Sequence, residues 1–408
     1  MIFGIGGPEL RFESKIIPLP FASSYTSLPL CSCSRIKIQK SHPPGSRTKR
    51  EGKSSPELQE QNPSTKPPTR LVSSTGSITS PLLYKEEGDV LRKFSFSELK
   101  NATNNFNRSQ WIKNGQFGNV YKGLIKPVKP AGDQGAHLVL VAITKLYNHS
   151  MQEHKEWLSG VEFLGVVEHP NLVKILGYCL VDDEKERQSQ RLLVYEYMPN
   201  KSLDYHLFNT TLPPIPWMKR LQILLGAAQG LAYLHQGLET QVLFGDFNSG
   251  DVLLDENFNP KLSEFGLERG QVRNLSYVRT VSFYASPEYV HCGHLKSNSD
   301  SWSFGIVLYE ILSGRRVIDR NLPHSQQMLT KWVKQFPADS KIFCMMMDPR
   351  LDNQYSLSGA RKVAKLADSC MRNNPEDRPT MSEIVDVLQE SIRDSEDESQ
   401  NPLPESST

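Results

Sequence analysis

The chain has 408 residues, 38% of them hydrophobic, which is enough for a folded core of roughly 250 to 300 residues with flanking segments. Its 47 basic and 45 acidic residues leave a formal charge of +2, and this balance argues against a nucleic-acid-binding protein. Six scattered cysteines without CxxC pairs argue against a disulfide scaffold and favour a reducing, intracellular compartment. No apolar run reaches the roughly 18 residues that span a bilayer, so any membrane contact is expected to be peripheral.

Residues 1–93 are rich in serine, proline and lysine and show no sustained periodicity, which predicts a largely disordered segment. Within it, Cys31 and Cys33 lie beside a basic run that begins at Arg35. Two acylated cysteines next to basic residues would supply the two signals that stable membrane anchoring needs. A solvated basic linker and a plastid-type targeting peptide are the open alternatives, since Met1 is followed by isoleucine and offers no myristoylation glycine.

Order is expected from Phe94 onward. The stretch FSFSELKNATNNF predicts a short helix that is capped by Ser97 and carries Leu99 and Ala102. The next two segments, WIKNGQFGNVYKGLI and HLVLVAITKL, have the β-branched and aromatic content of strands. A Pro/Gly turn region separates them.

Helical periodicity dominates the rest of the chain. The segment LQILLGAAQGLAYLH places its apolar residues on one broad helix face, namely Leu221, Leu224, Leu225, Ala228, Leu231 and Ala232. SWSFGIVLYEILSG is apolar almost all round and predicts a buried helix. Thr380 and Glu383 have the spacing of a capping box at the start of a last helix. This order predicts a small strand-rich lobe followed by a larger helical one.

A series of short motifs follows the same order. They are NGQFGNVYKG, VAIT (141–144), HPNLVKILGYC, LLVYEYM, FGDFNSGDVLLD (244–255), EFG (264–266), SPEY (286–289), DSWSFGIVLYE and DRPT (377–380). Together they resemble the eukaryotic protein kinases over roughly residues 94–393. FSFSELKNATNNF and SPEYVHCGHLKSNSD are further similar to plant receptor-like cytoplasmic kinases of the PBL type, the intracellular partners of surface receptors in immune signalling.

The resemblance implies an α+β, bilobal kinase fold in residues 94–395. Its small antiparallel-sheet N-lobe would cover about 94–198 and its larger helical C-lobe about 199–395, followed by an acidic, polar tail at 396–408. ATP and Mg²⁺ or Mn²⁺ are the implied cofactors. The implied partners are other proteins, namely receptor kinases or active cytoplasmic kinases, and the implied location is the cytoplasm, with peripheral association at the plasma membrane.

Several positions that carry kinase chemistry hold other residue types. In an active kinase a strand lysine holds the phosphates and a helix glutamate orients it. The matching positions are Thr144 and Gly160. Lys145 comes next, but consecutive strand side chains face opposite ways, so it is expected to point away from the nucleotide. The position of the catalytic base is retained as Asp246, whereas the lysine position two residues later holds Asn248.

The metal-binding and glycine-loop positions are also altered. Asp251 and Glu264 match the two metal-holding positions, and their oxygens still suit Mg²⁺ or Mn²⁺. The first loop glycine corresponds to Lys113, while Gly115 and Gly118 are kept. Two alternatives are open for Lys113: it reaches the phosphate site in place of the strand lysine, or it lies exposed at the base of the loop.

Positions that build the fold keep suitable residue types. By the resemblance, the adenine pocket and hinge comprise Val120, Ala142, Glu196, Tyr197, Met198 and Leu253. Phe265 belongs to the hydrophobic column between the lobes, Glu288 and Arg378 match a structural ion pair, and Asp300 matches the residue that anchors the catalytic loop. The arginine that docks a phosphorylated activation loop is replaced by Gly245, which disfavours control through Ser276, Thr280 or Ser282 by that route.

The electrostatic balance decides between the hypotheses. The pocket loses cations at Thr144 and Asn248 and gains an anion at Asp251, which predicts phosphotransfer slowed roughly 10³- to 10⁴-fold. The leading interpretation is a pseudokinase that acts as a scaffold, decoy or allosteric partner. The alternative is a low-activity serine/threonine kinase with Asp246 as base and Asp251 and Glu264 as metal ligands. A nonfunctional gene product is the third, so whether the chain is an active enzyme stays open.

Overall fold

The structure is a computed structural model that describes residues 91–115, 117–127, 138–147, 154–183, 188–265, 283–293 and 295–400. All of them belong to one unit, Ser77–Thr408. Residues 1–76 form the other unit and lie outside the described ranges. Among the described residues, no helix has both the length and the apolarity to cross a bilayer.

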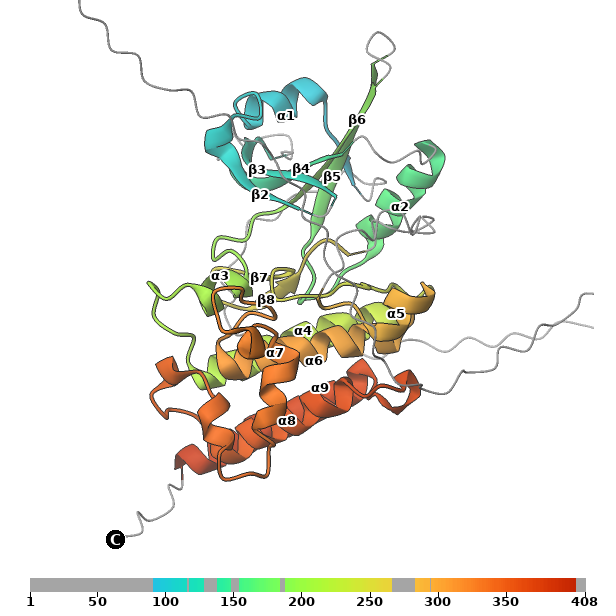
Figure 1. Cartoon of the computed structure of the whole chain (residues 1–408). Coiled ribbons are helices and arrows are strands. Elements are labelled where there is room, and N and C mark those ends of the chain that lie inside the picture. Colours follow the sequence, from blue (N-terminus) through green and yellow to red (C-terminus); the bar gives the residue numbers. More distant parts are fainter. Residues whose placement is uncertain are drawn as a thin grey trace, which may run out of the picture. The chain divides into compact units, whose positions relative to one another are not determined.

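A six-stranded sheet makes up most of the first part of the described chain (Figure 1). Its strands, in spatial order, are β1 (Arg92–Lys93), β5 (Ile175–Asp183), β6 (Gln188–Glu196), β4 (Val139–Leu146), β3 (Gly118–Ile125) and β2 (Trp111–Asn114). β1 pairs with β5 in parallel, and the other neighbouring pairs are antiparallel. The predicted antiparallel sheet is therefore corrected at this edge, where β1 is too short to carry a periodic pattern.

Helix α1 (Phe96–Ala102) packs against one face of the sheet, where Leu99 lies in a buried cluster with Val141 and Ile143. Its N-cap is Ser95, whose Oγ accepts a hydrogen bond from the backbone N–H of Glu98 at 3.2 Å. The prediction of Ser97 as the cap was wrong by two residues. The spacing of Ser95 and Glu98 is that of a capping box, which favours the earlier start.

The other face of the sheet contacts α2 (His154–Val166). Trp157, Val161 and Leu164 of this helix are buried in the same cluster as Leu193 of β6. Because successive strand residues face opposite ways, neighbouring β6 residues serve the two faces of the sheet. Leu192 accordingly packs in the α1 cluster and Leu193 in the α2 cluster.

The second part of the described chain is mostly helical. Its helices are α3 (Leu203–Phe208), α4 (Trp217–Gln236), α5 (Pro287–Cys292), α6 (Ser297–Ser313), α7 (Leu329–Trp332), α8 (Leu357–Cys370) and α9 (Met381–Gln400), with a small hairpin of β7 (Val252–Leu254) and β8 (Pro260–Leu262). Short 3₁₀ helices lie at Arg108–Gln110, His324–Gln326, Val333–Gln335, Phe343–Met346, Pro349–Leu351 and Pro375–Asp377. The predicted α+β architecture, a small strand-rich part followed by a larger helical part, is confirmed.

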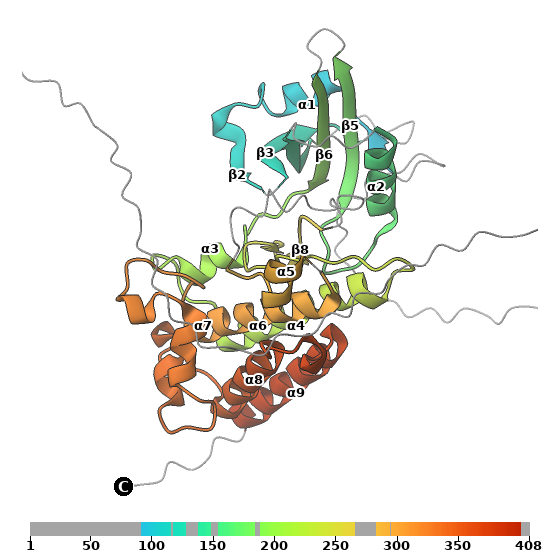
Figure 2. The same ribbon diagram turned by 45° about the vertical axis from the view of Figure 1, so that its right-hand side comes forward.

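Helices α4 and α6 run side by side near the sheet, while α8 and α9 lie farther from it (Figure 2). The α4 residues Leu221, Leu224, Ala228 and Leu231 are buried, as their spacing predicts, and almost every residue of α6 from Ser299 onward is buried too. The predicted capping box at α9 is formed, because Thr380 N donates to Glu383 Oε2 at 2.8 Å and Glu383 N to Thr380 Oγ1 at 3.3 Å. This packed base supports the loops that form the site.

A buried carboxylate lies on α6. Glu310 Oε1 accepts hydrogen bonds from the hydroxyl of Tyr284 at 2.7 Å and from the backbone N–H of Val317 at 3.0 Å. Burial raises the pKa of Glu310 to about 7, an effect that these hydrogen bonds reduce and that the charge of Asp204 increases. Glu310 therefore keeps its proton in the folded protein at pH values where the unfolded chain has released it.

We expect the free energy of unfolding to fall with rising pH between about 4.5 and about 7, because in that window the unfolded chain binds fewer protons than the folded one. Across this window the raised pKa of Glu310 lowers the free energy of unfolding by about 3 kcal/mol. Urea unfolding of the wild type and of Glu310→Gln at about pH 5 and about pH 7.5 measures it, since glutamine keeps the acceptor oxygen but cannot ionise. A difference between the two proteins that does not change with pH would contradict the expectation.

Candidate active site

A cavity of about 930 Å³ is lined by β2, β3, β4, the chain after β6, and the β7–β8 region. Among the residues predicted for the site, it contains Lys113, Gly115, Val120, Ala142, Thr144, Glu196, Tyr197, Met198, Leu253 and Glu264. Gly118, Gly160, Asp246, Asn248 and Asp251 do not line it. The size suits a nucleotide-sized ligand.

The hinge segment after β6 is fixed by a carboxylate. Glu196 Oε1 accepts hydrogen bonds from Lys261 Nζ at 2.7 Å and from the backbone N–H of Lys174 at 2.8 Å. Met198 is 8% exposed and Val120 9% exposed. These contacts join β6, β8 and the segment before β5 around the apolar part of the cavity.

The turn between β2 and β3 closes over Glu264. Gly115 N donates to Gly118 O at 2.8 Å, and Lys113 Nζ lies 3.1 Å from Glu264 Oε1. A Cβ atom at Gly115 would lie only 2.7 Å from the same carboxylate oxygen, so a side chain at this position would require Glu264 to move. The Lys113 amine thus reaches a carboxylate of the cavity while 36% of the side chain is exposed, and both alternatives for Lys113 stay open.

No cation stands at the strand position. Thr144 lines the cavity and pairs in register with Val120, whereas Lys145 Nζ lies 5.0 Å from the ring centroid of Phe106. Phe106 packs against the cluster on the α1 face of the sheet, so Lys145 points away from the cavity, as the alternation along the strand predicts. At Gly160 of α2, a Cβ atom would meet nothing within 4 Å. The missing side chain there has not been replaced by a neighbour.

A buried carboxylate on α6 fixes the position of the loop before β7. Asp300 of α6 is fully buried and accepts hydrogen bonds from the backbone N–H groups of Phe244 at 2.9 Å and Gly245 at 2.6 Å. His235, at the end of α4, donates from Nε2 to the same carboxylate at 2.8 Å. These three hydrogen bonds set the position of Asp246, the next residue along.

The side-chain amide of Asn248 forms its hydrogen bonds within this loop. Its Nδ2 donates to Asp251 Oδ2 at 2.7 Å and to the backbone carbonyl of Asp246 at 3.1 Å, while its backbone N–H also donates to Asp251 Oδ2 at 3.1 Å. Asp251 is buried, and burial together with the charge of Glu264 raises its pKa well above the ordinary value, partly offset by Lys113. Asn248 thus stabilises the loop and supplies no positive charge.

Gly245 adopts a left-handed backbone conformation, with φ of +78°. A Cβ atom at this position would lie 2.9 Å and 3.2 Å from the two methyl groups of Leu295. The space that a side chain would need is therefore filled by leucine. Both the backbone conformation and the packing favour glycine here.

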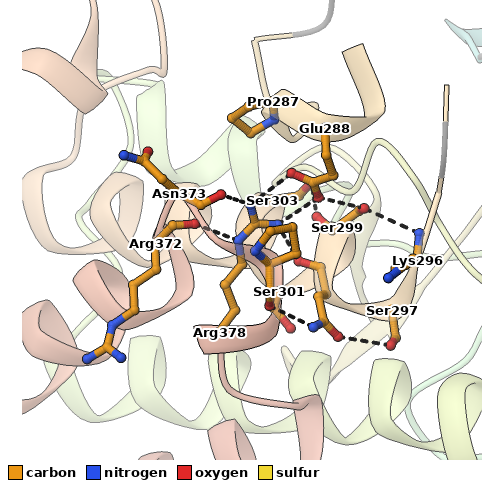
Figure 3. Close-up of polar contacts among 12 residues, drawn as sticks. Pro287, Glu288, Lys296, Ser297, Ser299, Ser301, Ser303, Arg372, Asn373 and Arg378 are labelled. Carbon is orange, nitrogen blue, oxygen red and sulfur yellow. Dashed lines mark hydrogen bonds and ion pairs between the residues drawn. The ribbon is translucent and has the colours of Figure 1, made fainter. Parts of the chain in front are cut away.

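A bidentate ion pair ties the first turn of α5 to the segment before α9 (Figure 3). Arg378 Nη1 and Nη2 lie 2.7 and 2.8 Å from the two carboxylate oxygens of Glu288. Arg378 also donates to the backbone carbonyls of Asn298 and Arg372, and Ser299 Oγ donates to Glu288. Burial alone would raise the pKa of Glu288, but the hydrogen bonds from Arg378 lower it to about 2.

Residues 106–388 match the family model described as protein tyrosine and serine/threonine kinase. The chain belongs to this protein kinase family. It is 47% identical over 339 residues to the probable serine/threonine-protein kinase PBL20 of Arabidopsis thaliana, covering 81% of this chain and 85% of that protein. It is 44% identical to the serine/threonine-protein kinase PCRK1 and 42% identical to PBL34 of the same organism, covering 78% of this chain and 76% and 65% of those proteins. Among protein kinases it is therefore a plant PBL-type receptor-like cytoplasmic kinase by family.

Protein kinases generally use ATP with a divalent metal. In this kinase the donors of suitable type are the carboxylates of Asp251 and Glu264, so the donor chemistry fits Mg²⁺ or Mn²⁺. Both are engaged with the protein itself, Glu264 with Lys113 and Asp251 with Asn248. Within the described ranges, no cluster of three or more His, Cys, Asp or Glu side chains forms a metal site.

Two residues that support the kinase site were missed by the sequence analysis. Lys261 pairs with the hinge residue Glu196, and His235 donates to Asp300. Lys261 gives no signal in the sequence. His235 could have been noticed as a buried polar residue at the end of the apolar face of α4.

The remaining predicted residues are a core residue and several that lie outside the described part of the chain. Phe265 is 7% exposed and lies in the main core cluster with Leu164. The candidate lipidation residues Cys31 and Cys33 lie outside the described residues, and so do the candidate phosphoacceptors Ser276, Thr280 and Ser282.

Proposed function

We propose that this chain is a low-activity, ATP-dependent serine/threonine protein kinase. The observation that carries the proposal is the ion pair of Lys113 with Glu264, because it keeps one cation in a cavity whose strand position holds Thr144. Membership of a family whose named relatives are serine/threonine kinases supports the same proposal. Asp246 is retained at the position of the catalytic base, which is the other group that phosphotransfer needs.

Each group has a defined task in the proposed reaction. Asp246 would accept the proton of a serine or threonine hydroxyl, and Lys113 would hold phosphate oxygens of ATP. Asp251 and Glu264 would hold a divalent metal, which would neutralise phosphate charge when bound. Glu196 and Met198 would hold the adenine ring at the hinge.

Three other positions would limit the rate of phosphotransfer. Thr144 and Gly160 provide no ion pair to orient phosphates, and the amide of Asn248 is held inside the loop. Removing a preorganised stabilising group typically costs about 10²- to 10³-fold in rate, and such losses are not additive. We therefore propose a rate roughly 10³- to 10⁴-fold below that of a kinase with the full set.

A second candidate function is a pseudokinase that acts through protein contacts as a scaffold, decoy or allosteric partner. The replacements at Thr144, Gly160 and Asn248 favour it, together with the intact Glu288–Arg378 pair that maintains the fold. Its partners would be receptor kinases or active cytoplasmic kinases in plant immune signalling. Its location would be the cytoplasm, with peripheral plasma-membrane association through acylated Cys31 and Cys33, and nucleic acid would not be a partner.

Transfer of labelled phosphate from ATP to a generic protein substrate separates the two candidates. We expect slow transfer by the wild type in the presence of Mg²⁺ or Mn²⁺, reduced at least about 100-fold in Asp246→Asn because the base is lost. Melting temperatures with ATP, recorded for both proteins, report nucleotide binding independently of turnover. Transfer that is equal in the two proteins comes from a contaminant and overturns the kinase proposal in favour of the pseudokinase.

A further inference from the structure

The ion pair of Lys113 and Glu264 joins two distant parts of the chain. Lys113 lies on β2 and Glu264 follows β8, and their side chains are 36% and 16% exposed. The carboxylate also adjoins the glycine loop, because the space of a Cβ atom at Gly115 lies 2.7 Å from its oxygen. Glu264 therefore presents an anion both to a lysine and to the backbone of the loop.

Glycine-rich loops bring backbone close to an anionic ligand because they lack side chains. Here the anion against Gly115 is the protein's own carboxylate. Glutamate reaches one methylene farther than the aspartate of the matching kinase motif. The extra length allows the carboxylate to stand where a phosphate group would meet Lys113 and the loop.

The backbone at Glu264 is strained. Its φ of +63° is in the left-handed region, which is uncommon for residues other than glycine and persists when surrounding contacts hold it. The ion pair with Lys113, at 3.1 Å, is one of those contacts.

We propose that Glu264 is an internal competitor that occupies the phosphate subsite at Lys113 in the nucleotide-free protein. This inference rests on the nucleotide binding in the proposed function and adds its regulation. A nucleotide polyphosphate displaces the carboxylate from Lys113, and the β2–β3 loop is then released from Glu264. Affinity for the polyphosphate is set by the strength of this ion pair as well as by the cavity.

Isothermal titration of the full chain with ATP, in a buffer with a metal chelator, tests the competition. We expect Glu264→Gln to bind ATP about three- to tenfold more tightly than the wild type, and Lys113→Ala to bind it more weakly. The gain from Glu264→Gln should be clearly smaller when Lys113 is also alanine, since the pair is then already broken. Glu264→Asp, which shortens the side chain and keeps its charge, should also bind ATP more tightly than the wild type.

The control variant is Lys145→Ala, which removes a lysine from the same sheet, on β4 and on the face beside Phe106, and its ATP affinity should equal that of the wild type. Adenosine lacks phosphate and should bind all the variants equally. An equal gain from Glu264→Gln with and without Lys113 would show simple charge repulsion and overturn the competition. If adenosine and ATP both fail to bind every variant, the nucleotide binding of the proposed function is overturned with it, whereas adenosine binding without a gain in ATP affinity overturns the competitor alone.

Discussion

Replacing Arg378 by methionine is expected to lower the free energy of unfolding by about 3 to 5 kcal/mol. The guanidinium side chain is fully buried, and its removal would leave the largely buried carboxylate of Glu288 without its charged partner. The same change removes hydrogen bonds to the backbone carbonyls of Asn298 and of Arg372, the second of which is labelled in Figure 3. Urea unfolding followed by tryptophan fluorescence measures the loss, because Trp302 lies directly beneath Arg378.

A neighbouring ion pair provides the matched control for this prediction. Lys296 and Glu376 are paired at 3.0 Å, but their side chains are 59% and 68% exposed. Lys296→Met should therefore cost less than about 1 kcal/mol. In the double variant Arg378→Met with Glu288→Gln, part of the stability should return, since no uncompensated charge stays buried. Equal losses for Arg378→Met and Lys296→Met would contradict the structural role given to the buried pair.

Restoring three side chains is expected to raise phosphotransfer by at least about 100-fold. The changes are Thr144→Lys, Gly160→Glu and Asn248→Lys, which return the strand lysine, its helix partner and the loop lysine. The cavity admits the first, and the surroundings of Gly160 admit the second, because a Cβ atom there meets nothing within 4 Å. Labelled-phosphate transfer by the triple variant, compared with the wild type under identical metal conditions, measures the gain.

Two further variants control the restoration. Gly160→Ala should stabilise α2 by removing a helical glycine without increasing transfer. Asp246→Asn in the triple variant should abolish the gain, because the base position acts in both backgrounds. If the triple variant folds and its transfer rate stays at the wild-type level, the limit lies elsewhere, at Asp251 and Glu264.

Local patterns in the sequence were sufficient to predict much of the architecture. The buried face of α4, the buried helix α6 and the capping box at Thr380 and Glu383 depend on residues within a few positions of one another. Strand alternation likewise predicts that Lys145 points away from the nucleotide site, and in the structure Lys145 lies beside Phe106 while Thr144 lines the cavity. These features could be predicted because they depend on the spacing of nearby residues along the helix or strand.

Other features depend on contacts between distant segments or on small local choices. The pairing of Lys113 with Glu264 depends on the conformation of the β2–β3 loop and on the length of the glutamate side chain. Neither of these can be predicted from the periodicity of the sequence. The parallel strand β1 has only two residues, too few for any periodicity. At α1, Ser95 and Ser97 are both acceptable caps by type, and the hydrogen bond to Glu98 decides for Ser95.

The packing at Gly245 also bears on whether control by loop phosphorylation could be engineered into this chain. An arginine at that position would need a backbone conformation that side chains disfavour, and its first carbon would collide with Leu295. Arginine alone would therefore restore the docking group for a phosphorylated loop only with a strained backbone and a displaced Leu295. A smaller residue at position 295 would relieve the collision and leave the backbone conformation as the remaining obstacle to that form of control.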